Sequence, residues 1–216
     1  GGFILIFAAL SCVVGVIYAL MEHDLKKLLA YHSVENIGII LLGVGLSMLF
    51  LKLKMPYLAV FALAAGLYHL VNHAIFKGLL FLCAGSVYRA TGTRDMEKLG
   101  GLIRRMPWTS ACFLCGAMAI SAIPPFNGFV SKWMIYQGLI ELGKTGDRLW
   151  AVWLAAAMFG SALTLASFMK LIHAIFLGQS ANKSIGKSVN EVSWQMWLPT
   201  VVLAIICVVF GVFASQ

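Results

Sequence analysis

Long apolar stretches separated by short polar segments dominate the chain. Six runs stand out, at residues 3–21, 33–51, 55–88, 108–141, 149–178 and 194–214. Each reaches the length of about 18 residues that marks a membrane-crossing helix. Because lipid offers backbone groups no hydrogen-bond partner, such runs form helices, and the alternation typical of a β-barrel is absent from the sequence. The pattern predicts an all-α polytopic membrane protein of about six transmembrane helices, with residues 1–216 as a single transmembrane domain.

Two of these runs, 55–88 and 108–141, are too long for a simple crossing, at 34 residues each. Straight helices of that length would reach about 51 Å, against a hydrocarbon core of ~30 Å, so they must tilt, protrude or break. Pro124, Pro125 and Gly128 predict a break of the second run in mid-membrane, because consecutive prolines remove backbone donors. Broken helices at that depth face protein or a wet cavity and often mark ion sites.

Composition excludes several classes of protein. Of the 216 residues, 61% are hydrophobic and 11% are charged, with a mean hydropathy of +0.92. A soluble core of this size cannot bury so much apolar surface, which rules out a water-soluble enzyme. All five cysteines lie inside apolar runs and give no disulfide framework, and the lone Cys112-x-x-Cys115 pair is interpreted as packing rather than a metal or redox site. The chain begins without a methionine, as though cut from a longer one.

Most basic residues lie between the apolar runs. A net charge of +8 would suggest a nucleic-acid partner in a soluble protein, but here the basic residues act as topology signals and no nucleic acid is expected. The first, third and fifth loops carry nine Lys and Arg residues, and the second and fourth carry four. The positive-inside rule therefore places the odd loops in the cytoplasm and both chain ends on the non-cytoplasmic side. The third loop, 89–107, is either a docking surface for a partner or only a topology anchor.

Three ionisable residues, His69, His73 and Lys77, form one stripe of the third run at positions i, i+4 and i+8. Such side chains cost at least ~2.5–3.5 kcal/mol each near the bilayer centre, so they usually have a function. Histidine exchanges protons near neutral pH, and a buried lysine can also do so. Steps of about 6 Å suit one or two bridging waters, which favours a proton wire over packed histidines and a snorkelling lysine. A structural metal site would need more ligands.

Three further ionisable residues lie within or beside apolar runs. Lys132 comes seven residues after Pro125, and the predicted break favours a functional lysine over one that snorkels to the interface. Glu35 is open to two interpretations, a point where protons enter the membrane or an acidic residue at a helix N-terminus. His173, near the end of the fifth run, is a candidate for lining a proton path.

The segments around these residues resemble the antiporter-like membrane subunits of respiratory complex I, multisubunit sodium/proton antiporters and energy-converting hydrogenases. Residues 24–33, D-L-K-K-L-L-A-Y-H-S, are similar to that family's D-I-K-R-L-L-A-Y-S-S signature. Residues 69–77 are similar to its H-x-x-x-H-A-x-F-K segment. Residues 123–132 look like its broken helix, in which a Lys or Glu ends the proton path. Residues 34–38 and 124–128 are most like the hydrogenase-4 and formate-hydrogenlyase branch.

This resemblance covers essentially the whole chain and implies a fourteen-helix protein with two inverted five-helix repeats, of which the chain holds the last six helices. The family's glutamate–lysine pair, on earlier helices, has no counterpart in the sequence. The resemblance also implies that His73 and Lys77 are groups on a central proton path and that Lys132 is an exit-side group. The chain would then be a fragment of a longer subunit or a split-gene product.

The sequence thus predicts proton translocation in the cell membrane by an antiporter-like subunit of an energy-converting redox complex. The complex would be of the membrane-bound hydrogenase, formate hydrogenlyase or NADH-quinone oxidoreductase-like type, with other membrane and peripheral subunits as partners. No cofactor or metal is expected in this chain, because the sequence has no dinucleotide fingerprint and no iron–sulfur cysteine quartet. The alternative is a sodium/proton antiporter module without a redox partner. A scaffold with a dead channel is disfavoured, since it would gain stability by losing its buried ionisable residues.

Overall fold

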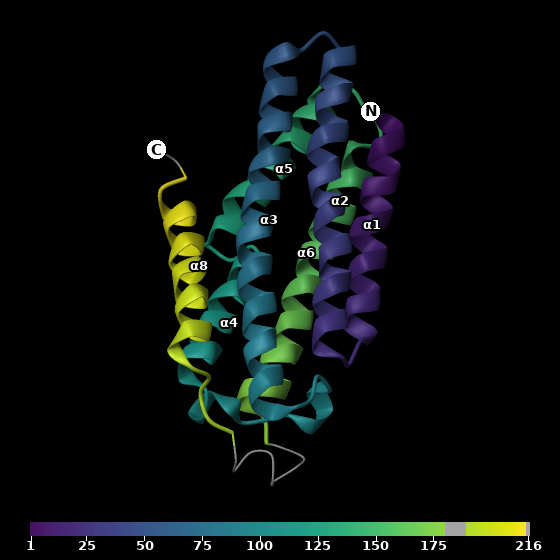
Figure 1. Ribbon diagram of the computed structural model, residues 1–216. Helices are drawn as coiled ribbons and strands as arrows, with labels where there is room; N and C mark the ends of the chain where they lie inside the picture. The colour runs from purple at the N-terminus through teal and green to yellow at the C-terminus, as the bar shows by residue number, and fades with distance from the viewer. Residues whose placement is uncertain (180–188, 215–216) are drawn as a thin grey trace.

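The computed structural model describes residues 1–179 and 189–214, and these residues form a bundle of helices (Figure 1). The helices are α1 (Gly2–Met21), α2 (Leu25–Lys52), α3 (Pro56–Thr91), α4 (Pro107–Ile120), α5 (Asn127–Lys144), α6 (Trp150–Ile172) and α8 (Trp194–Val212). Helix α6 continues into a π-helical turn, η3 (His173–Leu177), and two short 3₁₀ turns, η1 (Met96–Lys98) and η2 (Leu102–Arg104), precede α4. The predicted all-helical fold class is confirmed.

Within the described part of the chain, five helices are long and apolar enough to cross a membrane, namely α1, α2, α3, α6 with its π-helical extension, and α8. Helix α4 is apolar but shorter. Large apolar side chains cover the outside of the bundle, and among them Phe3, Val60 and Met169 are at least 60% exposed. Such a surface belongs in lipid or against other membrane helices, so the chain is a multi-pass membrane segment.

Helix α2 begins at Leu25 rather than at residue 33, where the apolar run begins. The carboxylate of Asp24 accepts hydrogen bonds from the N–H groups of Lys26 and Lys27 at 2.9 and 3.0 Å and so caps the helix. The first polar loop is therefore reduced to residues 22–24. Hydropathy marked the part of the helix that is uniformly apolar, whereas the cap determines where the helix begins.

Helix α3 is continuous over 36 residues, about 54 Å at 1.5 Å per residue, so this long run does not break. The α2–α3 hairpin extends past the N-terminal end of α1 (Figure 1).

Glycines bring the first three helices into backbone contact. A Cβ added at Gly43 of α2 would lie 2.7 Å from Cα of Gly66 in α3, and one added at Gly38 would lie 2.6 Å from the carbonyl oxygen of Ala8 in α1. Larger residues at these positions would push the helices apart.

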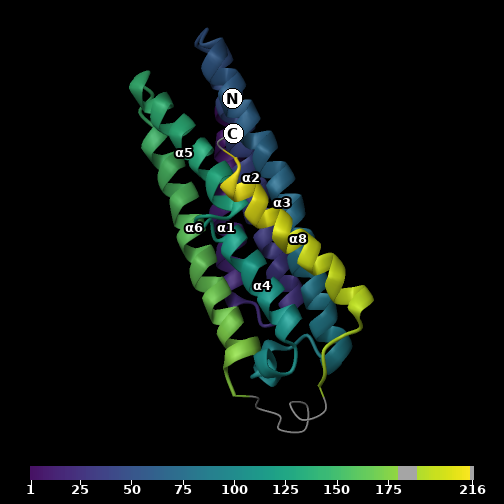
Figure 2. The ribbon, with the colours of Figure 1, turned by 90° about the vertical axis from the view of Figure 1, so that its left-hand side faces the viewer.

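The run 108–141 is interrupted between α4 and α5, at residues 121–126, as the sequence predicted. Pro124 and Pro125 lie in this segment and donate no backbone hydrogen bond. The beginning of α5 packs closely on the end of α4, since a Cβ at Gly128 would collide with the carbonyl group of Ala119. The interruption lies between the two ends of the bundle, not at either surface (Figure 2).

Residues 92–106 close one end of the bundle, called the loop end below, and they are tied to the start of α2. The N–H of Leu25 donates to the carbonyl of Arg94 at 2.9 Å, and the N–H of Met96 donates to the carbonyl of His23 at 3.0 Å. The first residue of the chain and the end of α8 both lie away from the loop end (Figure 1). Which face of the membrane the loop end meets stays a prediction.

Candidate functional site

The break between α4 and α5 positions a buried lysine. Lys132 lies on the second turn of α5, and its side chain is 1% exposed. Its Nζ donates to the carbonyl of Ile120, the last residue of α4, at 3.2 Å. The last carbonyls of a helix have no partner within the helix, and they carry the negative end of its dipole. The break thus supplies a backbone acceptor for an ammonium group in the interior of the bundle.

Glu35 of α2 is the carboxylate that meets this lysine. It is fully buried, and it lies about three turns after the start of α2. Its Oε1 is 3.4 Å from Nζ of Lys132, and its Oε2 accepts a hydrogen bond from the hydroxyl of Thr164 in α6 at 2.7 Å. This position in the helix interior contradicts the interpretation of Glu35 as an acidic residue at a helix N-terminus. The carboxylate instead joins α2, α5 and α6.

His32, one turn before Glu35, extends the cluster further along α6. Its Nδ1 lies 3.0 Å from Oε2 of Glu35, and its Nε2 lies 2.9 Å from the hydroxyl oxygen of Ser167. The carboxylate is an acceptor, so Nδ1 carries the proton and Nε2 accepts from the serine hydroxyl. An imidazole held this way links the carboxylate to α6.

His69 of α3 is bonded on both ring nitrogens as well. Its Nδ1 lies 2.9 Å from the hydroxyl oxygen of Ser131 in α5, and its Nε2 lies 3.2 Å from Oδ1 of Asn36 in α2. The amide nitrogen of Asn36 donates to Oε2 of Glu35 at 3.3 Å. Polar contacts therefore run without interruption through Ser131, His69, Asn36, Glu35 and Lys132, which we call the buried polar chain. It begins and ends on neighbouring residues of α5.

The other two residues of the α3 stripe lie outside this chain of contacts. Lys77 is buried, and its ammonium donates to the backbone carbonyl of Leu29 in α2. Nε2 of His73 is buried and has no hydrogen-bond partner among the described residues, and its ring packs edge-on against Phe76 at a centroid distance of 5.5 Å. Within residues 1–179 and 189–214, no direct hydrogen bond joins His69, His73 and Lys77, so water would have to bridge them.

His173 is remote from the buried polar chain. It begins the π-helical turn at the end of α6, and its side chain is exposed near the loop end. The structure thus brings Glu35, His69 and Lys132 together, places His73 and Lys77 beside them along α3, and leaves His173 at the surface.

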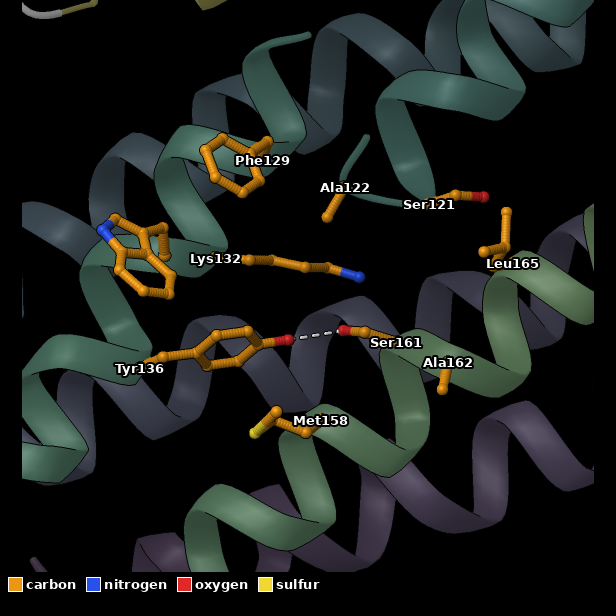
Figure 3. A pocket seen from close by; sticks show the side chains of 10 residues that line it. Ser121, Ala122, Phe129, Lys132, Tyr136, Met158, Ser161, Ala162 and Leu165 are labelled. Carbon is orange, nitrogen blue, oxygen red and sulfur yellow. Dashed lines mark hydrogen bonds between the residues drawn. The ribbon is translucent and has the colours of Figure 1, made fainter. Parts of the chain in front are cut away.

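A cavity of about 290 Å³ lies beside Lys132, between the helix break and α6. Figure 3 shows the lysine side chain pointing into the space between Ser121 and Ser161, and Tyr136 donates to or accepts from Ser161 at 2.6 Å. The hydroxyl oxygen of Ser121 is buried without a hydrogen-bond partner in the described part of the chain. The lining is mostly apolar, and Ser121, Tyr136 and Ser161 supply the polar atoms that a water molecule next to the ammonium group would need.

Sequence reasoning missed the residues that bond to the candidate groups, namely His32, Asn36, Ser131, Thr164 and Ser167. Four of them carry neutral hydroxyl or amide groups, which are common in membrane helices and do not stand out singly. His32 was assigned to a loop because the apolar run begins after it. The available signal was spacing, since His32, Glu35 and Asn36 lie at i, i+3 and i+4 and share one helix face once α2 starts at Leu25.

A bundle of membrane helices with one broken helix, and buried ionisable groups at the break, is typical of membrane-embedded subunits of the ion-transporter type. The chain belongs to the family described as NADH:quinone oxidoreductase/Mrp antiporter, transmembrane, which matches residues 2–164. This match confirms the resemblance that the sequence motifs indicated.

Relatives come from several branches of this family. The chain is 43% identical over 219 residues to hydrogenase-4 component B of Escherichia coli (strain K12), covering 100% of this chain and 32% of the relative. It is 37% identical over 201 residues to the Na(+)/H(+) antiporter subunit A1 of Staphylococcus haemolyticus (strain JCSC1435), covering 90% of this chain and 25% of the relative. A chain of the archaeal membrane-bound sulfane sulfur reductase, a respiratory membrane complex, superposes with a TM-score of 0.83 at 30% identity, covering 98% of this chain and 32% of that one.

The chain thus spans about a quarter to a third of the length of these proteins, and it matches the C-terminal part of its relatives.

Proposed function

We propose that the chain is the part of an antiporter-like subunit that carries protons across the cell membrane in an energy-converting redox complex of the hydrogenase type. The similarity to a hydrogenase-4 component and to an archaeal respiratory complex supports a redox partner. Electron transfer would take place in other membrane and peripheral subunits, and both chain ends would lie on the non-cytoplasmic side. The transported ion is the proton in this proposal, and sodium is the alternative that the experiments below address.

The observation that carries the proposal is the buried polar chain. Asn36 uses its amide nitrogen to donate to Glu35, so its Oδ1 accepts from Nε2–H of His69 and leaves Nδ1 of that ring as the free base. The base faces the hydroxyl of Ser131, which precedes Lys132 on α5. A histidine in this state can take a proton at Nδ1 and release it from Nε2 or from the same atom.

The charges of Glu35 and Lys132 couple proton release to proton uptake. While Lys132 is protonated, it neutralises the carboxylate at 3.4 Å. Once the lysine gives its proton to water in the adjacent cavity, Glu35 is left as a buried anion without its cation, which is unfavourable in low dielectric. Uptake of a proton through His32 or along the α3 stripe of Lys77, His73 and His69 relieves that charge. In this scheme His173 is a surface group through which protons reach the end of α6.

Proton uptake by vesicles that carry the whole complex tests this function. We expect Lys132→Ala to abolish uptake while the complex still assembles. Lys144→Ala is the matched control, because Lys144 lies on the same helix but is exposed and paired with Glu141 at the surface. Normal uptake in the Lys132→Ala complex would overturn the assignment of Lys132.

The choice between a redox complex and an antiporter needs a separate measurement. We expect hydrogenase or dehydrogenase subunits to co-purify with the full-length subunit, and we expect proton uptake to require an electron donor. If only other antiporter subunits co-purify and an imposed sodium gradient drives proton movement, the redox part of the proposal is wrong. The proton path through Glu35 and Lys132 would then serve a sodium/proton antiporter.

A further inference from the structure

A groove with a volume of about 490 Å³ follows α3 near the loop end, with the start of α2 and the start of α8 at its sides. Its walls change character along the bundle. Phe81, Leu82 and Gly85 line the part farther from the loop end, and Lys26 and Arg89 line the part nearest to it. Because α3 runs toward the loop end, the end of the groove nearest to it is basic, and we call this end the mouth. The rest of the groove, farther along the bundle, is apolar.

The basic mouth of the groove is built around one aromatic ring. Nζ of Lys26 lies 5.6 Å from the centroid of Tyr88, and the guanidinium carbon of Arg94 lies 4.8 Å from it. Lys26, Arg89 and Arg94 take part in none of the ion pairs found among the described residues. The two cations that line the groove, Lys26 and Arg89, therefore have no carboxylate of the described residues within ion-pair distance, and neither has Arg94, which lies over Tyr88 outside the lining.

Glu191 lines a neighbouring pocket together with Arg89, but its carboxylate forms hydrogen bonds with another part of the chain. It accepts hydrogen bonds from the N–H groups of Trp108 and Thr109 at 3.0 and 3.2 Å, at the start of α4. Anchored there, Glu191 caps a helix and forms no ion pair with Arg89, and Lys26 and Arg89 outnumber this one carboxylate.

The apolar part of the groove has room for a chain. A Cβ added at Gly85 would meet no heavy atom of the described residues within 4 Å. Phe81 and Leu82 beside it are 36% and 46% exposed. A hydrocarbon tail laid along this part would cover exposed apolar side chains without displacing any described atom next to Gly85.

We propose that this groove binds an anionic phospholipid, with its phosphate at Lys26 and Arg89 and an acyl chain along Phe81, Leu82 and Gly85. Basic pockets at the ends of membrane helices attract anionic headgroups, and arginine and lysine donate charge-assisted hydrogen bonds to phosphate. The apolar depth below the charges fits an amphiphile better than an acidic protein segment, whose backbone polar groups would enter the apolar part without partners. This proposal goes beyond the proton path and does not depend on it.

Photo-crosslinking in the complete complex tests the lipid site. Leu82 is replaced by a benzoyl-phenylalanine residue, and the complex is reconstituted in vesicles of equal parts phosphatidylglycerol and phosphatidylcholine. Mass spectrometry then identifies what is attached. With about fivefold preference expected from each of two cations, adducts with phosphatidylglycerol should outnumber those with phosphatidylcholine about 25-fold.

Four variants and a matched control make the test specific. Lys26→Gln and Arg89→Gln should each lower the preference for phosphatidylglycerol about fivefold, and together they should bring the adduct ratio close to one. Gly85→Leu fills the groove and should lower adducts with both lipids, while Lys52→Gln with Lys54→Gln, at the opposite end of the bundle, is the matched control and should change nothing.

Equal labelling of the two lipids by the unsubstituted groove would overturn the proposal. So would attachment to a protein segment in place of lipid, because the groove would then be a contact between polypeptides. An excess of phosphatidylglycerol adducts that remains after both cations are replaced would likewise contradict the assignment of Lys26 and Arg89.

Discussion

Two ion pairs of the same chemistry lie in opposite surroundings. The lysine nitrogen and carboxylate oxygen of Lys98 and Asp95, in the loop 92–106, are 3.0 Å apart, and their side chains are 63% and 37% exposed. Those of Lys132 and Glu35 are 3.4 Å apart, with side chains only 1% and 0% exposed. The shorter contact is the weaker one, because water screens both charges of an exposed pair. Distance alone does not rank ion pairs; burial and the surrounding hydrogen bonds do.

The buried pair differs from the exposed pair in what it requires of its neighbours. Glu35 is bonded to His32, Asn36 and Thr164 in addition to Lys132, and these bonds replace the water that the carboxylate lost. Two charges taken out of water repay their desolvation only with such help. The exposed pair can lose either partner to solvent, whereas the loss of either buried partner leaves the other charge with only its hydrogen bonds to compensate it.

The largest effect is expected when one buried charge is removed. Glu35→Ala leaves the ammonium of Lys132 without its carboxylate, and we expect a loss of about 3–5 kcal/mol in unfolding free energy together with the loss of proton uptake. Thermal unfolding of the purified complex and vesicle uptake measure the two effects. The double variant Glu35→Gln/Lys132→Met removes both charges, so it should recover most of the stability and none of the transport. Recovery of transport in the double variant would show that the pair is structural only.

The second-largest effect is expected when the contact between α3 and the buried ion pair is removed. His69→Phe removes a ring that bonds Ser131 and Asn36, and we expect proton uptake to fall about 100-fold or more, as for loss of a proton-transfer group. It also leaves Oδ1 of Asn36 without its partner, whereas the hydroxyl of Ser131 keeps its contacts with the carbonyls of Asn127 and Gly128 at 3.3 Å, so we expect a destabilisation of about 1–3 kcal/mol in all.

His73→Phe is the comparison on the same helix, because the free Nε2 of His73 leaves fewer described bonds to break. It should lower uptake while costing less stability than His69→Phe. Equal losses of stability in the two variants would contradict the difference in bonding between the two histidines.

A smaller effect is expected when the hydrogen bond between His32 and α6 is removed. Ser167→Ala removes the hydroxyl that donates to Nε2 of His32, and we expect a severalfold fall in proton uptake with about 1 kcal/mol of destabilisation, the net worth of one hydrogen bond. Ser110→Ala in α4 is the control, because this buried hydroxyl donates to the carbonyl of Met106, just before its own helix. If both variants transport alike, the path does not use the contact between His32 and Ser167.

The smallest effect is expected at the exposed pair. The Lys98 side chain and the N–H of Glu97 hold the pKa of Asp95 below its usual range. The stability that this carboxylate adds is therefore present above the ordinary Asp pKa and is lost as pH falls through the lowered value. Asp95→Asn should flatten that small acid-side change in melting temperature and leave proton uptake unaltered, as thermal unfolding across acidic pH and vesicle assays would show. A loss of uptake would mean that the loop takes part in transport.

The sequence predicted the parts of the molecule that depend on one-dimensional pattern. Apolar runs located the membrane helices, and Pro124 with Pro125 located the break. Lys132 stood out because a charge in an apolar run is rare. What pattern could not supply was the partner of each charge, since Glu35 and Lys132 are 97 residues apart along the chain and meet only through the packing of α2 on α5. His32 was missed for a different reason. The helix begins after its cap at Asp24, before the apolar run begins, so His32 lies in the helix and not in a loop.

The glycine contacts among α1, α2 and α3 have a mechanical consequence. With Gly43 against Gly66, and Gly38 against Ala8, the three helices touch backbone to backbone and cannot slide without collision. Glu35 lies on α2, one of these three closely packed helices. Lys132 lies on α5 just after the interruption, and the connecting segment is also closely packed, since a Cβ added at Gly211 of α8 would collide with the carbonyl oxygen of Pro125. Both charges are therefore held by closely packed backbone, so their separation is a fixed length of the fold unless a whole helix shifts.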